Sequence, residues 1–330
     1  VVKLLWYRNN ALGKPAKKKF ISRMNAYHGI TAVSASLTGI PANQRGFDVP
    51  LPGFLHVSCP HFYRFAKPGE TEEQFADRLA QELDDLIQKE GPETIAAFYG
   101  EPLMGAGGVI VPPETYWEKI QKVCRKHDIL IVADEVICGF GRTGNLFGSE
   151  TFGIKPDVMV LSKQLSSSYQ PIAAILINDL VYQGIADQSH ALGTLGHGFT
   201  GGGHPVATAV ALENLKIIQE DNLVEHAANM GEVLRHGLRR FIGHPLVGEV
   251  RGVGLIAAVE LVADRDTKAP FETVGRLGRY LASRAQDLGM IVRSMGDSIA
   301  FCPPLISTEK DIQAILDCFE QSLEDTWQWF

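Results

Sequence analysis

The stretch Ile129-Leu130-Ile131-Val132-Ala133-Asp134-Glu135-Val136 (ILIVADEV) sets an apolar, β-branched run directly before two acids. A run that is apolar at every position is typical of a strand buried on both faces of a sheet. In an open α/β sheet, ligands bind just beyond the carboxyl ends of the strands. An acid delivered there by a buried strand is costly unless it has a cationic partner. Asp134 is therefore a candidate ligand for a cationic group, with an N-cap or a structural salt bridge as the alternative.

Similar runs on either side of this stretch predict a sheet. Five further segments have strand character: 19–23, 54–58, 94–99, 157–161 and 172–177. Helical patterns at 71–90 and 113–127 lie between them, the first opened by the start signal Thr71-Glu72-Glu73. Strands that alternate with helices imply a mostly parallel α/β sheet wound with right-handed crossovers.

The character of the sequence changes after Gly203. Long helical patterns at 205–218 and 222–241 are followed by strand candidates at 255–261, 290–292 and 298–302 and by helices at 274–288 and 309–323. This order is typical of an α+β arrangement. We therefore predict a large domain over 1–219 and a smaller C-terminal α+β domain over 220–330.

Composition and charge argue against nucleic-acid binding. The 330 residues are 45% hydrophobic and 21% charged, which is ordinary for a soluble globular protein. The net charge of −7 argues against nucleic-acid binding, because phosphate binding needs concentrated Lys and Arg. Lys14–Lys19 (KPAKKK) is the one basic run, and we interpret it as a solvated turn in preference to a binding patch.

Cysteine use and hydropathy indicate a compartment. The five cysteines are odd in number, widely spaced and form no C-x-x-C pair, so neither a zinc site nor a disulfide framework is suggested. This usage is typical of a reducing cytosol, and we expect a cytoplasmic protein. No apolar run reaches the roughly 18 residues of a membrane span, and we expect no membrane partner.

A second strand-end residue is Lys163, in Asp157-Val158-Met159-Val160-Leu161-Ser162-Lys163. A lysine beside a pocket can lose its proton and attack a carbonyl. Taken alone, it could be an ordinary surface lysine. One strand-to-strand unit separates it from Asp134, so the two strand ends could lie side by side.

A glycine-rich loop follows at 196–205 (GHGFTGGGHP) and leads directly into a helix. Bare backbone N–H groups with the hydroxyl of Thr200 among them are suited to a phosphate. A flexible linker between domains is the alternative. The two histidines of the loop lack further ligands, so we expect no metal there.

A strand-end acid, a strand-end lysine and a Gly/Thr loop, in this order, resemble the class III aminotransferases of the fold-type I pyridoxal 5'-phosphate (PLP) enzymes. The chain is most similar to the ω-amino acid and amine:pyruvate aminotransferases. The resemblance covers essentially the whole chain and is carried by 27–29 (YHG), 134–144, 162–171 and 197–205. It implies a three-layer, mostly parallel sheet in a large PLP-binding domain.

The resemblance also implies a role for each matching residue of the cofactor site. Lys163 should form a Schiff base with PLP and then act as general base and acid. Asp134 should keep the pyridine nitrogen protonated, which makes the ring an electron sink. Val136 and Tyr27 should lie against the two faces of the ring, and His28 belongs to the same cofactor site. For Val136 and Tyr27, plain core packing is the alternative reading.

The resemblance implies roles for three further residues, in binding the phosphate, in binding the substrate and in the dimer. Thr200 should reach the phosphate of the neighbouring subunit's PLP, so the resemblance implies a homodimer with shared active sites. Arg293 should bind the substrate carboxylate, because a guanidinium pairs with it in bidentate fashion. Glu101 should support the substrate site beside the cofactor.

The sequence departs from the family in two places. Where the family commonly has glycines before the tyrosine and after the proline, this chain has Ser166-Ser167-Ser168-Tyr169 and Ile172. The small side chains preserve the space. The opening Val1–Tyr7 reads as the middle of an amphipathic helix without a cap, so we expect upstream sequence to be missing. The resemblance implies that this missing sequence includes part of the phosphate site.

These observations predict a PLP-dependent transaminase of the EC 2.6.1 type. It would move an amino group from an amine or ω-amino acid to a 2-oxo acid such as pyruvate, by a ping-pong mechanism. The alternative is a truncated homologue that folds and dimerises without holding PLP productively. The residues alone leave both open.

Overall fold

The computed structural model describes all 330 residues, which form two compact units. Unit 1 comprises residues 1–104, 112–139 and 148–217, and unit 2 comprises 105–111, 140–147 and 218–330. Two short segments that follow strands of unit 1 therefore belong to unit 2. The predicted division at residue 219 places both segments in the first domain.

Unit 1 is built on a six-stranded sheet with the order β2-β1-β3-β4-β5-β6. Its strands are β1 (Lys19–Arg23), β2 (Phe54–Val57), β3 (Ile95–Gly100), β4 (Leu130–Asp134), β5 (Val158–Leu161) and β6 (Ala174–Ile177). All neighbours pair in parallel except β5 and β6, which are antiparallel. The predicted mostly parallel sheet is confirmed, with each strand within two residues of its expected bounds.

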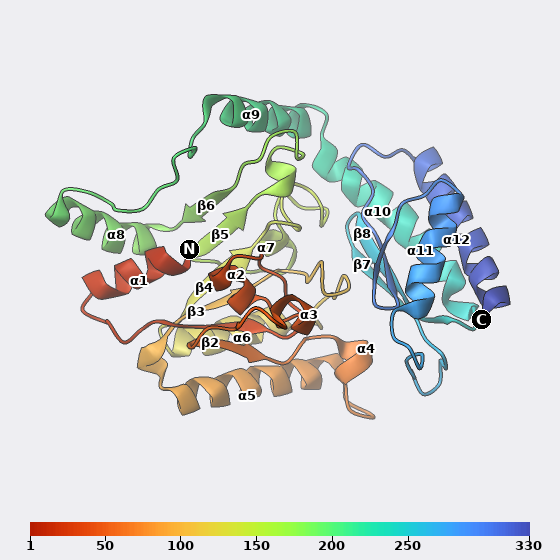
Figure 1. The fold of residues 1–330 in the computed structure, drawn as a ribbon, viewed down its shortest axis with the longest axis horizontal. Helices are drawn as coiled ribbons and strands as arrows, with labels where there is room; N and C mark the ends of the chain where they lie inside the picture. The colour runs from red at the N-terminus through yellow and green to blue at the C-terminus, as the bar shows by residue number, and fades with distance from the viewer. The chain divides into compact units, whose positions relative to one another are not determined.

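Helices cover both faces of this sheet and make three layers (Figure 1). On one face, α5 (Glu72–Glu90) and α6 (Tyr116–Lys126) bury an apolar stripe that includes Phe75, Leu83 and Ile120. On the other, α1 (Val2–Ala11) and α8 (Asp179–Leu192) contribute Leu5 and Val181 to a second core. Burial of this kind contributes about 25 cal/mol per Å² of apolar surface, so the two cores hold the sheet in place.

The remaining helices of unit 1 are short or lie at its edge. They are α2 (Ala32–Leu37), α3 (Pro41–Gln44), α4 (Phe62–Phe65), α7 (Gly148–Thr151) and α9 (Pro205–Glu220), whose last residues belong to unit 2. Figure 1 shows residues 193–204 as an extended connection from α8 to α9. The sequence patterns did not predict the helix α8.

The basic run before β1 is neutralised within unit 1. Lys14 and Lys17 both contact Asp128, at 2.8 and 3.1 Å, and Lys19 contacts Glu90 at 2.8 Å. Lys14 and Lys17 hold the turn before β1 against the turn before β4, and Lys19 joins β1 to the end of α5.

Unit 2 is a four-stranded antiparallel sheet with the order β7-β8-β10-β9. Its elements are α10 (Leu223–Arg239), β7 (Val247–Val253), β8 (Ile256–Leu261), α11 (Arg276–Asp287), β9 (Arg293–Met295), β10 (Ser298–Phe301) and α12 (Glu309–Trp329). Phe319 of α12 centres its aromatic core, 5.1 Å from the rings of both Phe241 and Phe301. The predicted α+β arrangement is confirmed.

One predicted strand of unit 2 was wrong. Residues 290–292 form no strand, and β9 begins at Arg293, the residue after the predicted strand. The tight turn at Gly296, with φ of 62°, fixes the register of the β9–β10 hairpin and pairs Arg293 with Ala300. Ile291 is 89% exposed, so its apolar side chain is not part of a buried strand.

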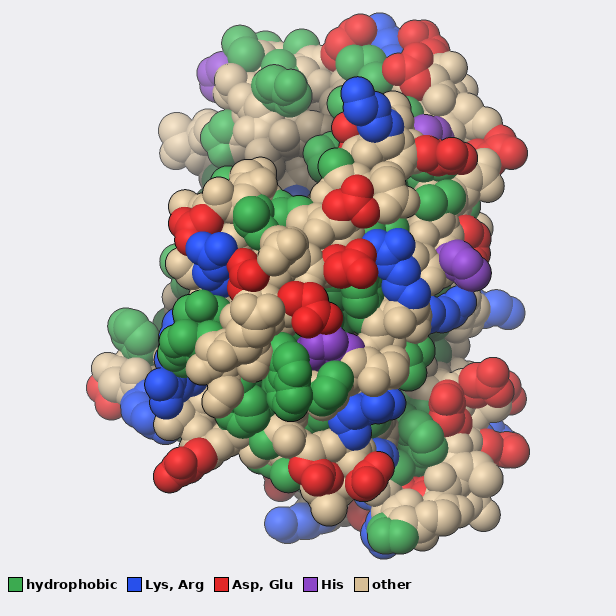
Figure 2. Space-filling view, turned by 90° about the vertical axis from the view of Figure 1, so that its right-hand side faces the viewer, with side chains coloured by type: hydrophobic (Ala, Val, Ile, Leu, Met, Phe, Trp, Pro, Cys, Tyr) green, Lys and Arg blue, Asp and Glu red, His purple; other side chains and the backbone are tan.

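The surface carries charges of both signs. Figure 2 shows acidic and basic side chains intermixed on the face that it presents, without a continuous basic area. On α11 and α12, Arg284 contacts Asp325 at 2.8 Å, an example of this mixing. No helix in the chain has both the length and the apolar character needed to span a membrane.

Candidate active site

The strand ends bring the two central residues of the site to one edge of the sheet. Strands β4 and β5 are parallel neighbours, with Asp134 opposite Val160. Asp134 is the last residue of β4, and Lys163 follows β5 by two residues. Because parallel strands end at the same edge, the carboxylate and the amine leave the sheet on the same side.

Asp134 is a buried carboxylate held by two donors from unit 1. Its Oδ2 lies 2.8 Å from Nδ1 of His28, and its Oδ1 accepts the backbone N–H of Val136 at 3.1 Å. The side chain is 6% exposed and has no Lys or Arg partner. A buried carboxylate with spare lone pairs and no permanent cation is a ready acceptor for a cationic ligand.

His28 belongs to the wall of the site. Its side chain is fully buried, and its ring meets Tyr99 edge-on with centroids 4.7 Å apart. Its backbone N–H donates to Thr38 Oγ1 at 2.9 Å. In this structure His28 contacts Asp134, and its assignment to the cofactor site stays a prediction.

Glu101 ties the segment 24–29 to the end of β3. Its Oε1 accepts the backbone N–H of Tyr27 at 3.1 Å, and its carbonyl accepts Nη2 of Arg23. Burial raises the pKa of the Glu101 carboxyl, and the charge of Asp134 raises it further, against the opposing effect of His28. The ends of β1, β3 and β4 are therefore joined around one buried cluster, while the predicted substrate role of Glu101 stays a prediction.

Gly39 is required for this arrangement. A Cβ at this position would meet the carbonyl oxygen of Arg23 at 2.1 Å and Cα of Met24 at 2.8 Å. The Gly39 N–H donates to the carbonyl of Ala26 at 2.8 Å, and its carbonyl accepts from Asn25. Only glycine lets these chains approach so closely.

The backbone that presents Lys163 is strained. Lys163, Ser167 and Ser168 have φ of 44°, 47° and 61°, a left-handed conformation that L side chains rarely adopt. Such residues persist only where the surroundings hold them, and they cluster at functional sites. The Lys163 side chain is exposed, so it is available to react.

The other predicted site residues are placed as follows. Val136 and Tyr27 are half-buried beside Asp134 and Glu101. Thr200 is exposed in the extended connection 193–204, and the structure does not bring it into contact with the strand-end cluster. Arg293 is an exposed residue of unit 2. Unit 1 alone therefore assembles Tyr27, His28, Glu101, Asp134, Val136 and Lys163 at one edge.

The residues present fit PLP. A protonated pyridine nitrogen needs a buried carboxylate, which Asp134 supplies, and the aldehyde needs a primary amine, which Lys163 supplies from the adjacent strand end. His28 and Val136 fix the carboxylate, as groups that orient a ligand must do.

The glycine-rich segment after Asp134 has a packing role that the sequence did not reveal. Within unit 2, Nη1 of Arg142 donates to the carbonyls of Leu255 and Pro303 at 2.8 and 2.7 Å. A Cβ on Gly254 would meet the backbone of Thr143 at 2.2 Å. This segment is therefore a packing element of unit 2.

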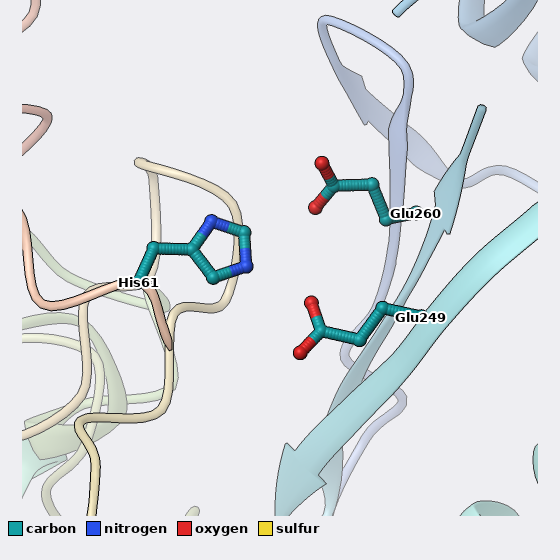
Figure 3. A group of neighbouring side chains, drawn as sticks. All are labelled: His61, Glu249 and Glu260. Carbon is teal, nitrogen blue, oxygen red and sulfur yellow. The ribbon is translucent and has the colours of Figure 1, made fainter. Parts of the chain in front are cut away.

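A pair of carboxylates in unit 2 is an ion-pair site. Figure 3 shows Glu249 of β7 and Glu260 of β8 turned to the same side of their sheet. Both contact Nη1 of Arg251, Glu249 at 2.6 Å. The guanidinium compensates their charge, and we assign no metal to them. His61, the third residue in Figure 3, belongs to unit 1.

The fold and the strand-end cluster define a PLP-type group-transfer site on a three-layer sheet. The family model for class-III aminotransferases matches residues 2–323, and the chain belongs to this family. Class III aminotransferases use PLP, as the sequence predicted.

The relatives support the same assignment. The chain is 51% identical over 325 residues to "Gamma aminobutyrate transaminase 1, mitochondrial" of Solanum lycopersicum, covering 98% of this chain and 63% of that protein. Among solved structures, it is 75% identical to an omega transaminase from Pseudomonas jessenii in complex with PMP, with a TM-score of 0.99. It is 60% identical to a transaminase with L-ala, with a TM-score of 0.98.

The chain is shorter than these relatives. It spans 63% of the length of the tomato transaminase, which is under two thirds. The match to the Pseudomonas structure covers 99% of this chain and 72% of that chain. The match to the transaminase with L-ala covers 99% of this chain and 77% of that one. The activity, substrates and partners of the whole protein are therefore argued below as proposals.

Proposed function

We propose that this protein is a PLP-dependent transaminase that moves an amino group from an amine or ω-amino acid to a 2-oxo acid such as pyruvate. The observation that carries this proposal is the pairing of Asp134, held by His28, with Lys163 at neighbouring strand ends. When bound, PLP draws electrons from the carbon next to the substrate nitrogen and so eases removal of its proton.

Each residue of the chain then has a task. The Asp134 carboxylate would accept the hydrogen of the pyridine nitrogen, and His28 and Val136 keep this carboxylate in place. The Lys163 amine would hold the cofactor, and once free its Nζ would take up and return the substrate proton. Thr200 is proposed to bind the phosphate, and Arg293 the carboxylate of carboxylated substrates.

The donor class rests on similarity and needs its own test. The purified chain with PLP is supplied with pyruvate and a ¹⁵N-labelled donor, either a carboxylate-free amine or an ω-amino acid. We expect ¹⁵N in the alanine formed, measured by mass spectrometry. A folded, PLP-loaded chain that labels no alanine from any donor would favour the alternative of a homologue that dimerises without transferring nitrogen.

A homodimer is the proposed assembly. Several large apolar side chains of unit 1 face solvent, among them Phe199 at 83%, Ile30 at 79% and Phe47 at 71% exposure. Burial of exposed apolar side chains between two copies of the chain would support such a dimer. Sedimentation analysis is expected to give twice the 36.1 kDa of one chain. A mass of one chain at micromolar concentration would contradict the dimer. Cytoplasmic location stays a prediction, which fractionation of expressing cells would test.

A further inference from the structure

Asn214 of α9 is a polar residue on an otherwise apolar helix face. It follows the buried Ala207 and Ala211 at helical spacing, so the three side chains lie on one side of α9. An amide at such a position needs hydrogen-bond partners, because a buried polar group without them is costly. Its partners all lie in the segment that follows Lys163.

The side chain of Asn214 binds this segment through both ends of its amide. Its Nδ2 donates to the carbonyl of Gln164 at 2.7 Å and to that of Leu165 at 3.3 Å. Its Oδ1 accepts the hydroxyl of Ser167 at 2.6 Å, and that hydroxyl in turn accepts Nε2 of Gln164 at 2.8 Å. One side chain thus contacts both the 3-10 turn Lys163–Leu165 and the turn that follows it.

These contacts fall on the strained part of the chain. Lys163 and Ser167 have positive φ, and Ser168 follows with φ of 61°. The backbone hydrogen bonds of Ser166, Ser167 and Ser168 are long, at 3.2–3.4 Å, whereas those of Leu165 and Tyr169 on either side are 3.0 Å. Such weak local bonds contribute little toward holding a left-handed conformation, so the stronger contacts to α9 must contribute more.

We infer that Asn214 is a positioning residue for Lys163. Asn214 clamps residues 163–168 in the strained conformation that presents the Lys163 amine. This inference rests on the proposed function, since it assigns Lys163 as the residue that receives PLP. The helix α9 begins directly after the connection 193–204, which carries Thr200. The contact of Asn214 with Gln164 therefore also holds the helix in which this connection ends.

The test compares Asn214→Ala with two other variants. Glu213→Ala alters an exposed neighbour and serves as the control. Asn214→Asp keeps an acceptor for Ser167 but loses both N–H donors. Hydrogen exchange of residues 162–172 is followed without cofactor. We expect about ten-fold faster exchange in Asn214→Ala and Asn214→Asp, and unchanged exchange in Glu213→Ala. Peptides from β1 and β3 should not change, which excludes general unfolding.

PLP capture supplies the second readout. The PLP concentration that half-saturates borohydride trapping on Lys163 is expected to rise about ten-fold in Asn214→Ala. Unchanged exchange in this variant would overturn the clamp. Faster exchange with unchanged trapping would overturn the positioning role and leave a structural one. If the unaltered chain traps no PLP, the proposed function fails, while exchange still reports on the clamp.

Discussion

Replacing Lys163 by alanine is expected to lower the rate of amino transfer by about 10²–10⁴-fold, the usual contribution of a positioned acid–base group. The loss has two sources, because the same amine binds the cofactor and then moves the substrate proton. The measurement is the initial rate of alanine formation from pyruvate at saturating donor. The exposed Lys155, which lies just before β5, supplies the matched control as Lys155→Ala.

The Lys163 variant should fold normally. Its side chain is exposed, so truncation removes no core packing, and the strained backbone is held by contacts that do not involve the amine. Circular dichroism of both lysine variants should therefore match the unaltered chain. A Lys163→Ala protein that keeps more than a tenth of the activity would remove this lysine from the reaction.

Replacing Asp134 by asparagine is expected to lower kcat/KM by roughly 10- to 100-fold, the equivalent of about 1.5–3 kcal/mol for a charge-assisted hydrogen bond. Asparagine keeps the shape and an acceptor for the Val136 N–H, and His28 can meet the new amide as its other tautomer. The variant therefore removes the negative charge and little else.

Steady-state kinetics of Asp134→Asn beside Asp187→Asn, an exposed acid on α8, tests this prediction. The control should behave as the unaltered chain. A variant Asp134→Asn with kcat/KM within about two-fold of the control would show that the acid does not act on the cofactor ring.

The central strands and the strand-end residues could be predicted from sequence because buried parallel strands are apolar at every position. The run before Asp134 and the run before Lys163 are both of this kind, and both strands were placed to within a residue. The strand β9 could not be placed, because the exposed Ile291 imitates a buried residue and the hairpin turn at Gly296 sets the register.

Long-range hydrogen bonds were beyond sequence reasoning. Nothing local to His28 shows that its ring reaches Asp134, since the contact joins the segment after β1 to the last residue of β4. Asn214 gave one usable signal, a polar residue in an apolar helical stripe, but its partner could not be named without the path of the chain. The same holds for Arg142, whose carbonyl partners lie more than a hundred residues away.

Covalent capture of the cofactor tests the central claim most directly. The chain is incubated with PLP, reduced with borohydride, digested and mapped by mass spectrometry. We predict one modified peptide, carrying the reduced cofactor on Lys163, with loss of the label in Lys163→Ala. A folded chain that carries no label, or carries it on another lysine, would contradict the assignment of Lys163 and Asp134 as a PLP site.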